Sequence, residues 1–247
     1  MFTKKYEFVE EPTPAYAEDG TLLRRIRALV DIPKHGVKAG DLGGFIESEA
    51  NLSHGGIAWI EGDAHVWGDA RVMDAACVTG RVRVFCCARI LDDAIVADSA
   101  RISGRVTVSA RAVVCGFARA GDYAVITGYS TIRDYAEVCG DARILDNAFV
   151  TGRAKINGKA RVCSYANISH DGVIERDVDY ITFGPDHVTG SFITIHQDSR
   201  IGVRVNMPDF SGSLEEAQEH IKALALSNQR PFAGSLLDAA GMQFNAG

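Results

Sequence analysis

Residues 94–114 read AIVADSARISGRVTVSARAVV, where an aliphatic residue returns at every sixth position: Val96, Ile102, Val108 and Val114. The same step continues in both directions, from Ile60 to Ile168, without an insertion or deletion. Nineteen positions form this column, and only Ala120 is not β-branched. A second column lies two places earlier, from Ala58 to Ala166, and is alanine except at Val82, Val106 and Ser130. A fixed short period of this kind predicts a solenoid.

Each six-residue unit predicts a short strand followed by a corner. Because strand side chains alternate, the small and the aliphatic residue point to the same, inner face. The residues that follow tolerate sharp turns and left-handed conformations: Gly62-Asp63, Gly68-Asp69, Asp92-Asp93, Gly140-Asp141 and Asp146-Asn147. We expect strands of about three to four residues, and three units per triangular 18-residue coil. Nineteen units then stack into about six coils, or about 29 Å.

A helical interpretation fails, because a period of six does not match 3.6 residues per turn and the valine and glycine content is wrong for helices. The repeat extends weakly outward at Gly44-x-Ile46, Ala50-x-Leu52 and Gly172-x-Ile174, with a two-residue slip at 53–56. We therefore predict an N-terminal cap over 1–43, an all-β solenoid over 44–178 and a C-terminal α+β cap over 179–247.

The flanking segments are expected to cover the exposed strand edges of the solenoid, which would otherwise favour end-to-end stacking. At the N-terminus, residues 6–10 and 22–32 predict a β-hairpin joined by a loop over 12–20. At the C-terminus, residues 180–183, 191–196 and 201–205 predict an antiparallel meander. Ser213 and Glu216 form a capping box for a helix running to about Asn228, with Pro231 ending it and a short helical tail over 235–240.

The composition is that of an ordered globular chain: 247 residues, 47% hydrophobic, 23% charged, with a formal net charge of −6. No apolar run of membrane-spanning length and no apolar signal core is present, so we expect a cytoplasmic protein. The acidic balance argues against wholesale nucleic-acid binding but leaves room for a local basic stripe. The six cysteines are Cys77, Cys86, Cys87, Cys115, Cys139 and Cys163. Because the sequence has no CxxC motif and no paired-histidine spacing, we interpret them as plain thiols in a reducing compartment and predict no metal or cofactor.

The Val-x-Gly-Asp-Ala-x units resemble the hexapeptide-repeat, left-handed β-helix class, whose members include trimeric acyltransferases. The handedness is implied by this class alone. In the usual acyltransferase hexad glycine directly follows the aliphatic residue, whereas here it comes one place later. A closer likeness is to uncharacterised phage and prophage hexapeptide-repeat proteins, carried by residues 5–8, 23–29, 37–49, 51–53 and 210–216. It covers nearly the whole chain and implies an architecture rather than an activity.

Residues between the two inward positions point outward and recur every 18 residues, which gives three columns. The first is an apolar stripe: Trp59, Cys77, Ile95, Val113, Thr131, Phe149 and Asn167. A contiguous exposed apolar surface usually marks an interface, so we expect self-association or partner docking here. The alternative is that the flanking segments fold back over the stripe.

The second column includes the ladder Arg83, Arg101 and Arg119, about 5 Å apart, which could hold phosphates or carboxylates of an anionic ligand. Salt bridges with nearby corner aspartates are the alternative: Asp92, Asp93, Asp98, Asp122 and Asp134. The third column is Arg71, Arg89, Thr107, Val125, Arg143 and Arg161. Tyr123, Tyr129 and Tyr135 occupy consecutive corners of one coil, with Phe117 one coil before Tyr135, either as recognition aromatics or as cover for a flanking segment.

Two classes of function follow. Acyl transfer by a trimer, as the resemblance implies, would need a histidine base and usually a loop inserted between coils. The hexads carry no such loop. His65 is the only histidine inside the repeat, and His54 and His170 lie just outside its two ends. A zinc enzyme of the γ-carbonic anhydrase type would need three histidines at a spacing that is absent. We therefore expect a non-enzymatic interaction protein, homo-oligomeric, with a protein partner that the phage resemblance makes a host factor or antiviral-defence component. A filament or scaffold protein is a third possibility, disfavoured by the caps.

Overall fold

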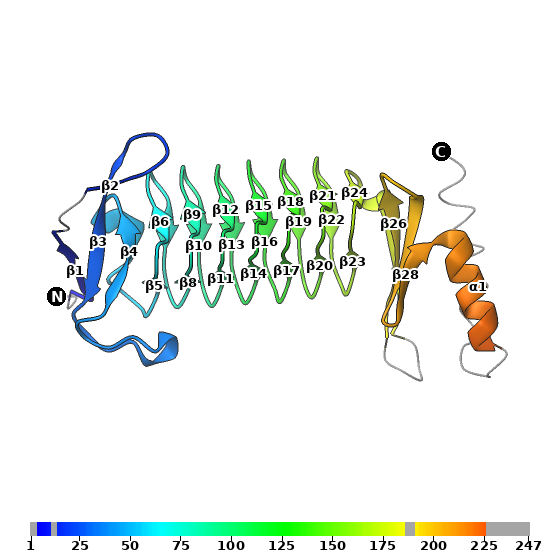
Figure 1. The fold of residues 1–247 in the computed structure, drawn as a ribbon, viewed down its shortest axis with the longest axis horizontal. Coiled ribbons are helices and arrows are strands. Elements are labelled where there is room, and N and C mark those ends of the chain that lie inside the picture. Colours follow the sequence, from blue (N-terminus) through cyan, green and yellow to red (C-terminus); the bar gives the residue numbers. More distant parts are fainter. Residues whose placement is uncertain (1–3, 11–13, 186–190, 226–247) are drawn as a thin grey trace.

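The computed structural model describes residues 4–10, 14–185 and 191–225. The chain forms a β-solenoid with a cap at each end (Figure 1). Three sheets run along the prism, and through the regular coils each strand pairs in parallel with the strand 18 residues later, as in Cys77 with Ile95 and Ile95 with Val113. The predicted solenoid architecture is confirmed.

The first face belongs to the long sheet, which the N-terminal segment extends. Its order begins β1 (Tyr6–Val9), β3 (Leu22–Ala28) and β4 (Leu42–Ile46), all antiparallel, with β2 (Ala15–Tyr16) also pairing with β3. It continues in parallel through β6 (His65–Val66), β9 (Arg83–Val84), β12 (Arg101–Ile102), β15 (Arg119–Ala120), β18 (Glu137–Val138), β21 (Lys155–Ile156) and β24 (Val173–Ile174).

Two further parallel sheets complete the triangle in the described residues. The six-stranded sheet comprises β7 (Arg71–Val72), β10 (Arg89–Ile90), β13 (Thr107–Val108), β16 (Val125–Ile126), β19 (Arg143–Ile144) and β22 (Arg161–Val162). The seven-stranded sheet comprises β5 (Trp59–Ile60), β8 (Cys77–Val78), β11 (Ile95–Val96), β14 (Val113–Val114), β17 (Thr131–Ile132), β20 (Phe149–Val150) and β23 (Asn167–Ile168).

The core consists of the two columns that define the repeat. The alanine column and the valine and isoleucine column are both buried along the prism, as at Ala94 and Val96, and form one continuous cluster. About seven coils are present rather than about six, because strands outside the strict repeat, such as β4 and β24, join the long sheet. The slip at 53–56 is confirmed, since Ile46 pairs with Val66, 20 residues on.

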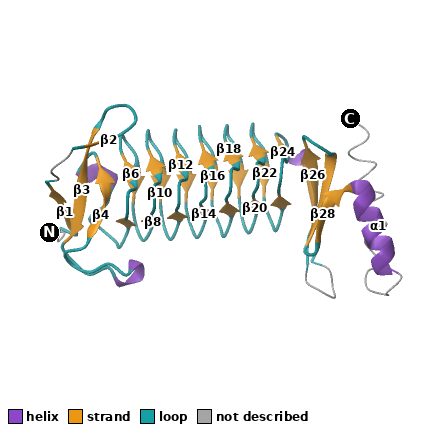
Figure 2. Cartoon of the chain, viewed as in Figure 1, coloured by secondary structure: helices purple, strands orange, loops and turns teal. Residues whose placement is uncertain are grey.

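The strands are shorter than predicted: each solenoid strand is two residues long (Figure 2). The reason is the corner, because every sixth residue from Gly62 to His170 has a positive φ and turns the chain. Ladder hydrogen bonds still flank each strand, as in Ile95 N–H to Ala112 O and Ala97 N–H to Val114 O, both 2.9 Å. The corner pairs identified in the sequence therefore turn as expected.

The N-terminal cap is the predicted hairpin, with β1 paired to β3, and it closes the first coil with polar contacts. Tyr6 is buried and donates its hydroxyl to the Leu52 carbonyl at 2.9 Å, while Lys5 Nζ donates to the Ala58 carbonyl at 2.7 Å. Two short 3-10 turns, η1 (Pro33–His35) and η2 (Glu49–Asn51), lie within this region.

The C-terminal cap is an antiparallel sheet with a helix behind it. The turn η3 (Asp177–Asp179) leads into β25 (Tyr180–Phe183), β26 (Ile193–Asp198), β27 (Gly202–Met207) and β28 (Phe210–Ser213), a strand beyond the predicted three. Helix α1 (Leu214–Ala225) opens with the predicted capping box, Ser213 N–H to Glu216 Oε2 at 2.7 Å and Glu216 N–H to Ser213 Oγ at 3.2 Å. The predicted helix end at Asn228, Pro231 and the tail over 235–240 lie outside the described residues.

The two faces of this small sheet differ in polarity. Ile195, Val205 and Met207 form a buried cluster with Ala217 and Ile221 of α1. The opposite, polar face meets the last coil of the solenoid. No helix in the described ranges is long and apolar enough to cross a membrane.

Candidate interaction surfaces

The apolar column lies on the seven-stranded sheet as predicted, with its members in register from coil to coil. The prediction that it points to solvent is wrong at Trp59, which is 0% exposed. A Cβ atom at Gly43 would lie only 2.8 Å from Trp59 Cζ2, so β4 passes directly against the indole ring. The N-terminal cap therefore covers the first residue of the column. At this end, the alternative that a flanking segment folds back over the stripe is correct.

The middle of the column is open. Ile95 is 41% exposed, and Val113, Thr131 and Phe149 are partly exposed. At the corner beside β14 and β17, the exposed rings of Phe117 and Tyr135 stack with centroids 5.1 Å apart. The apolar surface thus widens from the column onto the corner.

Cys77 lies between the covered and the open part of the column and is half-buried. Burial raises the pKa of its thiol to about 11, and Glu61 adds to the shift. The thiol therefore stays protonated near neutral pH and contributes to the surface as a small apolar group.

The three tyrosines lie on consecutive corners of one coil as predicted, and all three are exposed. Each has a neighbour one coil away: Arg105 lies 5.9 Å from the Tyr123 ring, Arg111 lies 5.4 Å from the Tyr129 ring, and Phe117 stacks on Tyr135. Because the corners are on different sides of the prism, the tyrosines do not form one cluster. Tyr135 belongs to the apolar surface, and Tyr123 borders the six-stranded sheet.

The arginine ladder on the long sheet has carboxylate partners within the chain. Glu18, from the loop between β2 and β3, lies 3.3 Å from Arg83 and bonds Arg101 as well. The Arg101 hydrogen bond lowers the pKa of Glu18. Arg119 lies 3.7 Å from Glu137. The salt-bridge alternative holds for these three arginines, but their partners are two glutamates rather than the corner aspartates, so an anionic ligand would have to displace Glu18.

The same loop is anchored by a small aromatic cluster. Trp67 stacks on Phe85 with centroids 4.6 Å apart, and its indole N–H donates to Asp19 at 2.9 Å. Ala17 and Leu23 complete the buried side of this cluster. The loop before β3 therefore covers the outer face of the first coils of the long sheet.

The corner aspartates have a structural role instead. The carboxylate of each accepts the backbone N–H of the residue one coil further on, at 2.8–3.1 Å; the aspartates are Asp92, Asp98, Asp122, Asp134 and Asp146. All five have a positive φ near 60°. Aspartate suits this position because it tolerates the left-handed conformation and its short side chain reaches a backbone donor.

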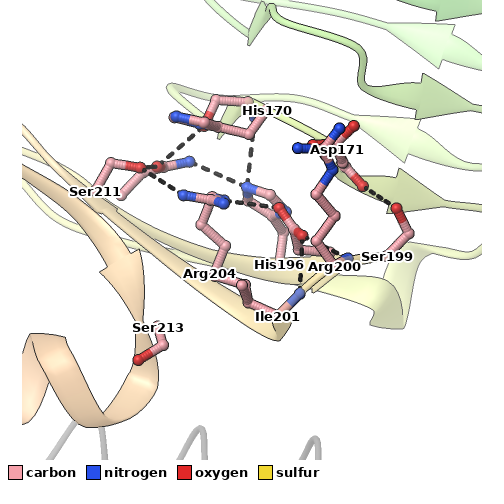
Figure 3. Close-up of polar contacts among 12 residues, drawn as sticks. His170, Asp171, His196, Ser199, Arg200, Ile201, Arg204, Ser211 and Ser213 are labelled. Carbon is pink, nitrogen blue, oxygen red and sulfur yellow. Dashed lines mark hydrogen bonds and ion pairs between the residues drawn. The ribbon is translucent and has the colours of Figure 1, made fainter.

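A buried polar joint, which sequence reasoning missed, connects the last coil to the C-terminal cap (Figure 3). Thr194 Oγ1 accepts the N–H of Asn167 at 2.9 Å, and Asn206 Nδ2 donates to the carbonyl of Asn167 at 2.7 Å. His196 Nε2 accepts from Ser169 N–H at 3.4 Å and from Asn206 Nδ2 at 3.1 Å. Side chains of β26 and β27 thus occupy the hydrogen-bonding positions that a further coil would fill.

Charged groups continue the joint. Arg204 and Asp198 are both buried and pair at 2.7 Å, and Arg204 also donates to Ser211 at 3.3 Å. The sequence signal was the alternation of Thr194 and His196 in the predicted strand 191–196, continued by Asp198 just beyond it, which places polar groups on one face.

The three histidines considered as bases have different surroundings. His54 stacks on Tyr6 in the N-terminal cap and accepts the N–H of Lys5 at 3.1 Å. His65 lies on β6 against Phe45, and desolvation first, then Arg83, lowers its pKa. His170 is at the last solenoid corner, 2.8 Å from Ser169 Oγ. The fold does not bring them together within one chain.

The cysteines are all free thiols, and among the described residues no group of three or more His, Cys, Asp or Glu side chains could hold a metal ion. In comparisons with known proteins, no protein-family model matches the chain, and no curated protein matches it either.

Proposed function

We propose that this protein is a non-enzymatic interaction protein that binds a macromolecular partner through the open middle of the seven-stranded sheet. The observation that carries the proposal is the exposure of Ile95, at 41%, within an apolar surface shared with Val113 and the Phe117–Tyr135 stack. Exposed aromatic and aliphatic side chains gathered into one contiguous surface are typical of protein interfaces.

The position of the two caps supports the proposal. Both ends of the column are used within the chain, since β4 covers Trp59 and the C-terminal sheet bonds the backbone of Asn167. Between them, Ile95 and Val113 remain accessible. A chain that covers Trp59 at one end of the sheet, caps the backbone at the other end and leaves an apolar middle open has a surface suited to another molecule.

The resemblance to phage-encoded hexapeptide-repeat proteins suggests the source of the partner. We propose a bacterial host protein, with components of antiviral defence included, in a cytoplasmic setting. This step rests on the resemblance in the sequence, whereas the location of the surface rests on the exposed side chains.

The test compares the chain with Ile95→Glu/Val113→Glu in affinity capture from bacterial lysate and in native mass spectrometry. The matched control is Leu22→Glu/Leu42→Glu, which makes the same apolar-to-acidic change at exposed positions of the N-terminal cap, away from the seven-stranded sheet. We expect the first pair to lose the captured protein, or the oligomer, with an unchanged circular dichroism spectrum, and the control to retain it.

Retention of every partner and of the solution mass by Ile95→Glu/Val113→Glu would refute the proposal. Acetyl-CoA added in the same mass spectrometry distinguishes the enzyme alternative. A trimer that takes up one acetyl-CoA per subunit would favour an acyltransferase instead.

A further inference from the structure

The charge of this chain is unevenly distributed along the prism. Residues 81–165, the central coils, hold 13 Lys and Arg against 8 Asp and Glu, a net charge of +5. The rest of the chain holds 13 basic and 24 acidic residues, a net charge of −11. The overall charge of −6 therefore hides a basic middle between acidic ends.

Most carboxylates of the central coils are already engaged. Five belong to the aspartate ladder that accepts backbone N–H groups. Asp93 pairs with Lys34 and Arg111, and Glu137 pairs with Arg119. These carboxylates therefore have limited freedom to neutralise further arginines.

Several cations without a carboxylate partner lie on the six-stranded sheet, although Arg81, Arg153 and Lys155 also lack one elsewhere in the described structure. Arg71, Arg89, Arg143 and Arg161 point outward and are exposed, and in the described part of the chain none has a carboxylate oxygen within 4.0 Å. The same is true of Arg105 and Lys159 on the bordering corner. The arginine ladder of the long sheet differs, because Glu18 and Glu137 neutralise it.

The four outward arginines form two adjacent pairs. Arg71 is in register with Arg89, and Arg143 with Arg161, so each pair is one strand spacing, about 4.8 Å, apart. Like charges opposite each other on neighbouring strands are unfavourable. A carboxylate placed over each pair would offset that repulsion and accept charge-assisted hydrogen bonds.

We propose that the face of the six-stranded sheet binds an acidic protein segment, with carboxylates on the two arginine pairs. This inference rests on the proposed function and names a second contact surface and its chemistry. Arg89 and Arg143 are three coils apart, about 14 Å, which four residues of an extended peptide span. The matching ligand is an extended segment with acidic residues about four positions apart.

Two observations favour a protein over a nucleic acid. Between the arginine pairs lie the partly exposed, uncharged Thr107 and Val125, with Tyr123 at the border, and arginine and tyrosine are the residue types enriched at protein interfaces. Asp122 and Asp141 lie at the same border and would repel a continuous phosphate backbone. A polypeptide can place carboxylates on the arginines and neutral residues beside the aspartates.

The test measures binding of fluorescein-labelled poly-L-glutamate by fluorescence anisotropy at low ionic strength. The variant is Arg143→Glu/Arg161→Glu, with Arg143→Gln/Arg161→Gln as a milder second variant should the first unfold. The matched control, Arg153→Glu/Lys155→Glu, makes the same charge change on exposed residues away from the six-stranded sheet. We expect about tenfold weaker binding in the first variant, an intermediate loss in the second and less than about twofold change in the control.

Equal loss in both charge-reversed pairs would show attraction to net charge alone and overturn the inference. So would an absence of poly-L-glutamate binding, or tighter binding of a single-stranded oligonucleotide that the Arg143 and Arg161 variants abolish. If poly-L-glutamate fails to bind while Ile95→Glu/Val113→Glu still loses its partner, the proposed function stands and this inference falls. If Ile95→Glu/Val113→Glu keeps its partner and poly-L-glutamate does not bind, both the proposed function and this inference are refuted.

Discussion

The carboxylate of Asp122 accepts a hydrogen bond from the backbone N–H of Gly140, one coil further along the chain, at 2.9 Å. Asp122 also has a φ of 59°, which most side chains avoid. One residue therefore turns its own corner and ties that corner to the next coil. Asp92, Asp98, Asp134 and Asp146 repeat the arrangement.

The first prediction concerns this contact. Asp122→Ala should lower the free energy of unfolding by about 1–3 kcal/mol, because alanine loses the hydrogen bond and pays the cost of a left-handed conformation. Asp122→Gly should lose less, since glycine adopts the conformation freely, and Asp122→Asn should be close to the parent because it keeps an acceptor oxygen. Urea denaturation followed by circular dichroism measures the order of the three variants.

The control is Asp141→Ala, at a corner position whose carboxylate makes no hydrogen bond in the described structure. It should change stability by less than about 0.5 kcal/mol. If Asp141→Ala and Asp122→Ala have equal effects, the ladder hydrogen bond does not stabilise the corner.

The second prediction concerns Trp59, the buried start of the apolar column. Trp59→Ala should destabilise the protein by about 3–5 kcal/mol, because it leaves a large cavity between β4 and the first coil. Ile95→Ala on the same column should cost less than about 1 kcal/mol, because Ile95 is 41% exposed. Equal urea midpoints for the two variants would contradict the observed burial of Trp59.

The solenoid could be predicted from the sequence because its cause is local and repeated. A small residue, an outward residue and a β-branched residue recur with a turning residue every sixth position, and each unit meets an almost identical unit one coil away. The register follows from the period alone, as Ile95 with Val113 illustrates. Strand length was predicted wrongly, because a pattern of alternation does not show how early the corner residue bends the chain. The number of coils was too low, because the strands that join outside the strict repeat, such as β4 and β24, have no strict six-residue signal.

The sequence does not predict which outward side chains of the solenoid are covered or paired by the caps, because these contacts join segments that do not share the six-residue period. Glu18 reaches Arg101 across 83 residues, and Trp59 is covered by β4. The polar joint at His196 follows from the chemistry of the last coil, which leaves backbone groups without a strand to pair with. The alternation of polar residues in β26 was visible, but the surface it would meet was not.

The third prediction concerns thiol reactivity. Cys86 and Cys87 are exposed and should react rapidly with a disulfide reagent at pH 8. Cys77 should react slowly, because burial raises its pKa to about 11, and burial also raises the pKa values of Cys115 and Cys139. Cys86→Ser/Cys87→Ser should remove the rapid phase, measured by absorbance as the reagent's thiolate is released. A rapid phase that persists in this variant would contradict the assignment.

The last prediction concerns pH and the polar joint. His196 Nδ1 lies 2.8 Å from the Gln197 carbonyl, so we assign the proton to Nδ1 and leave Nε2 to accept from Asn206 Nδ2 and Ser169 N–H. A second proton on Nε2 would point at those two donors, so protonation of His196 would break both hydrogen bonds. Burial is the largest cause of a pKa lowered to about 4; Asp198 opposes the shift, while Arg204 and His170 add to it.

Because this folded-state pKa lies below the ordinary value of 6.5, the unfolded chain binds more protons between pH 4 and 6.5. The contribution of His196 to stability is complete above about pH 6.5 and falls as the pH drops toward 4, by up to about 3 kcal/mol. His196→Gln keeps an acceptor without this titration, so its unfolding free energy should depend less on pH across that window. Urea denaturation at a series of pH values compares the two proteins, and equal slopes between pH 4 and 6.5 would show that His196 titrates in the folded protein as it does in the unfolded chain.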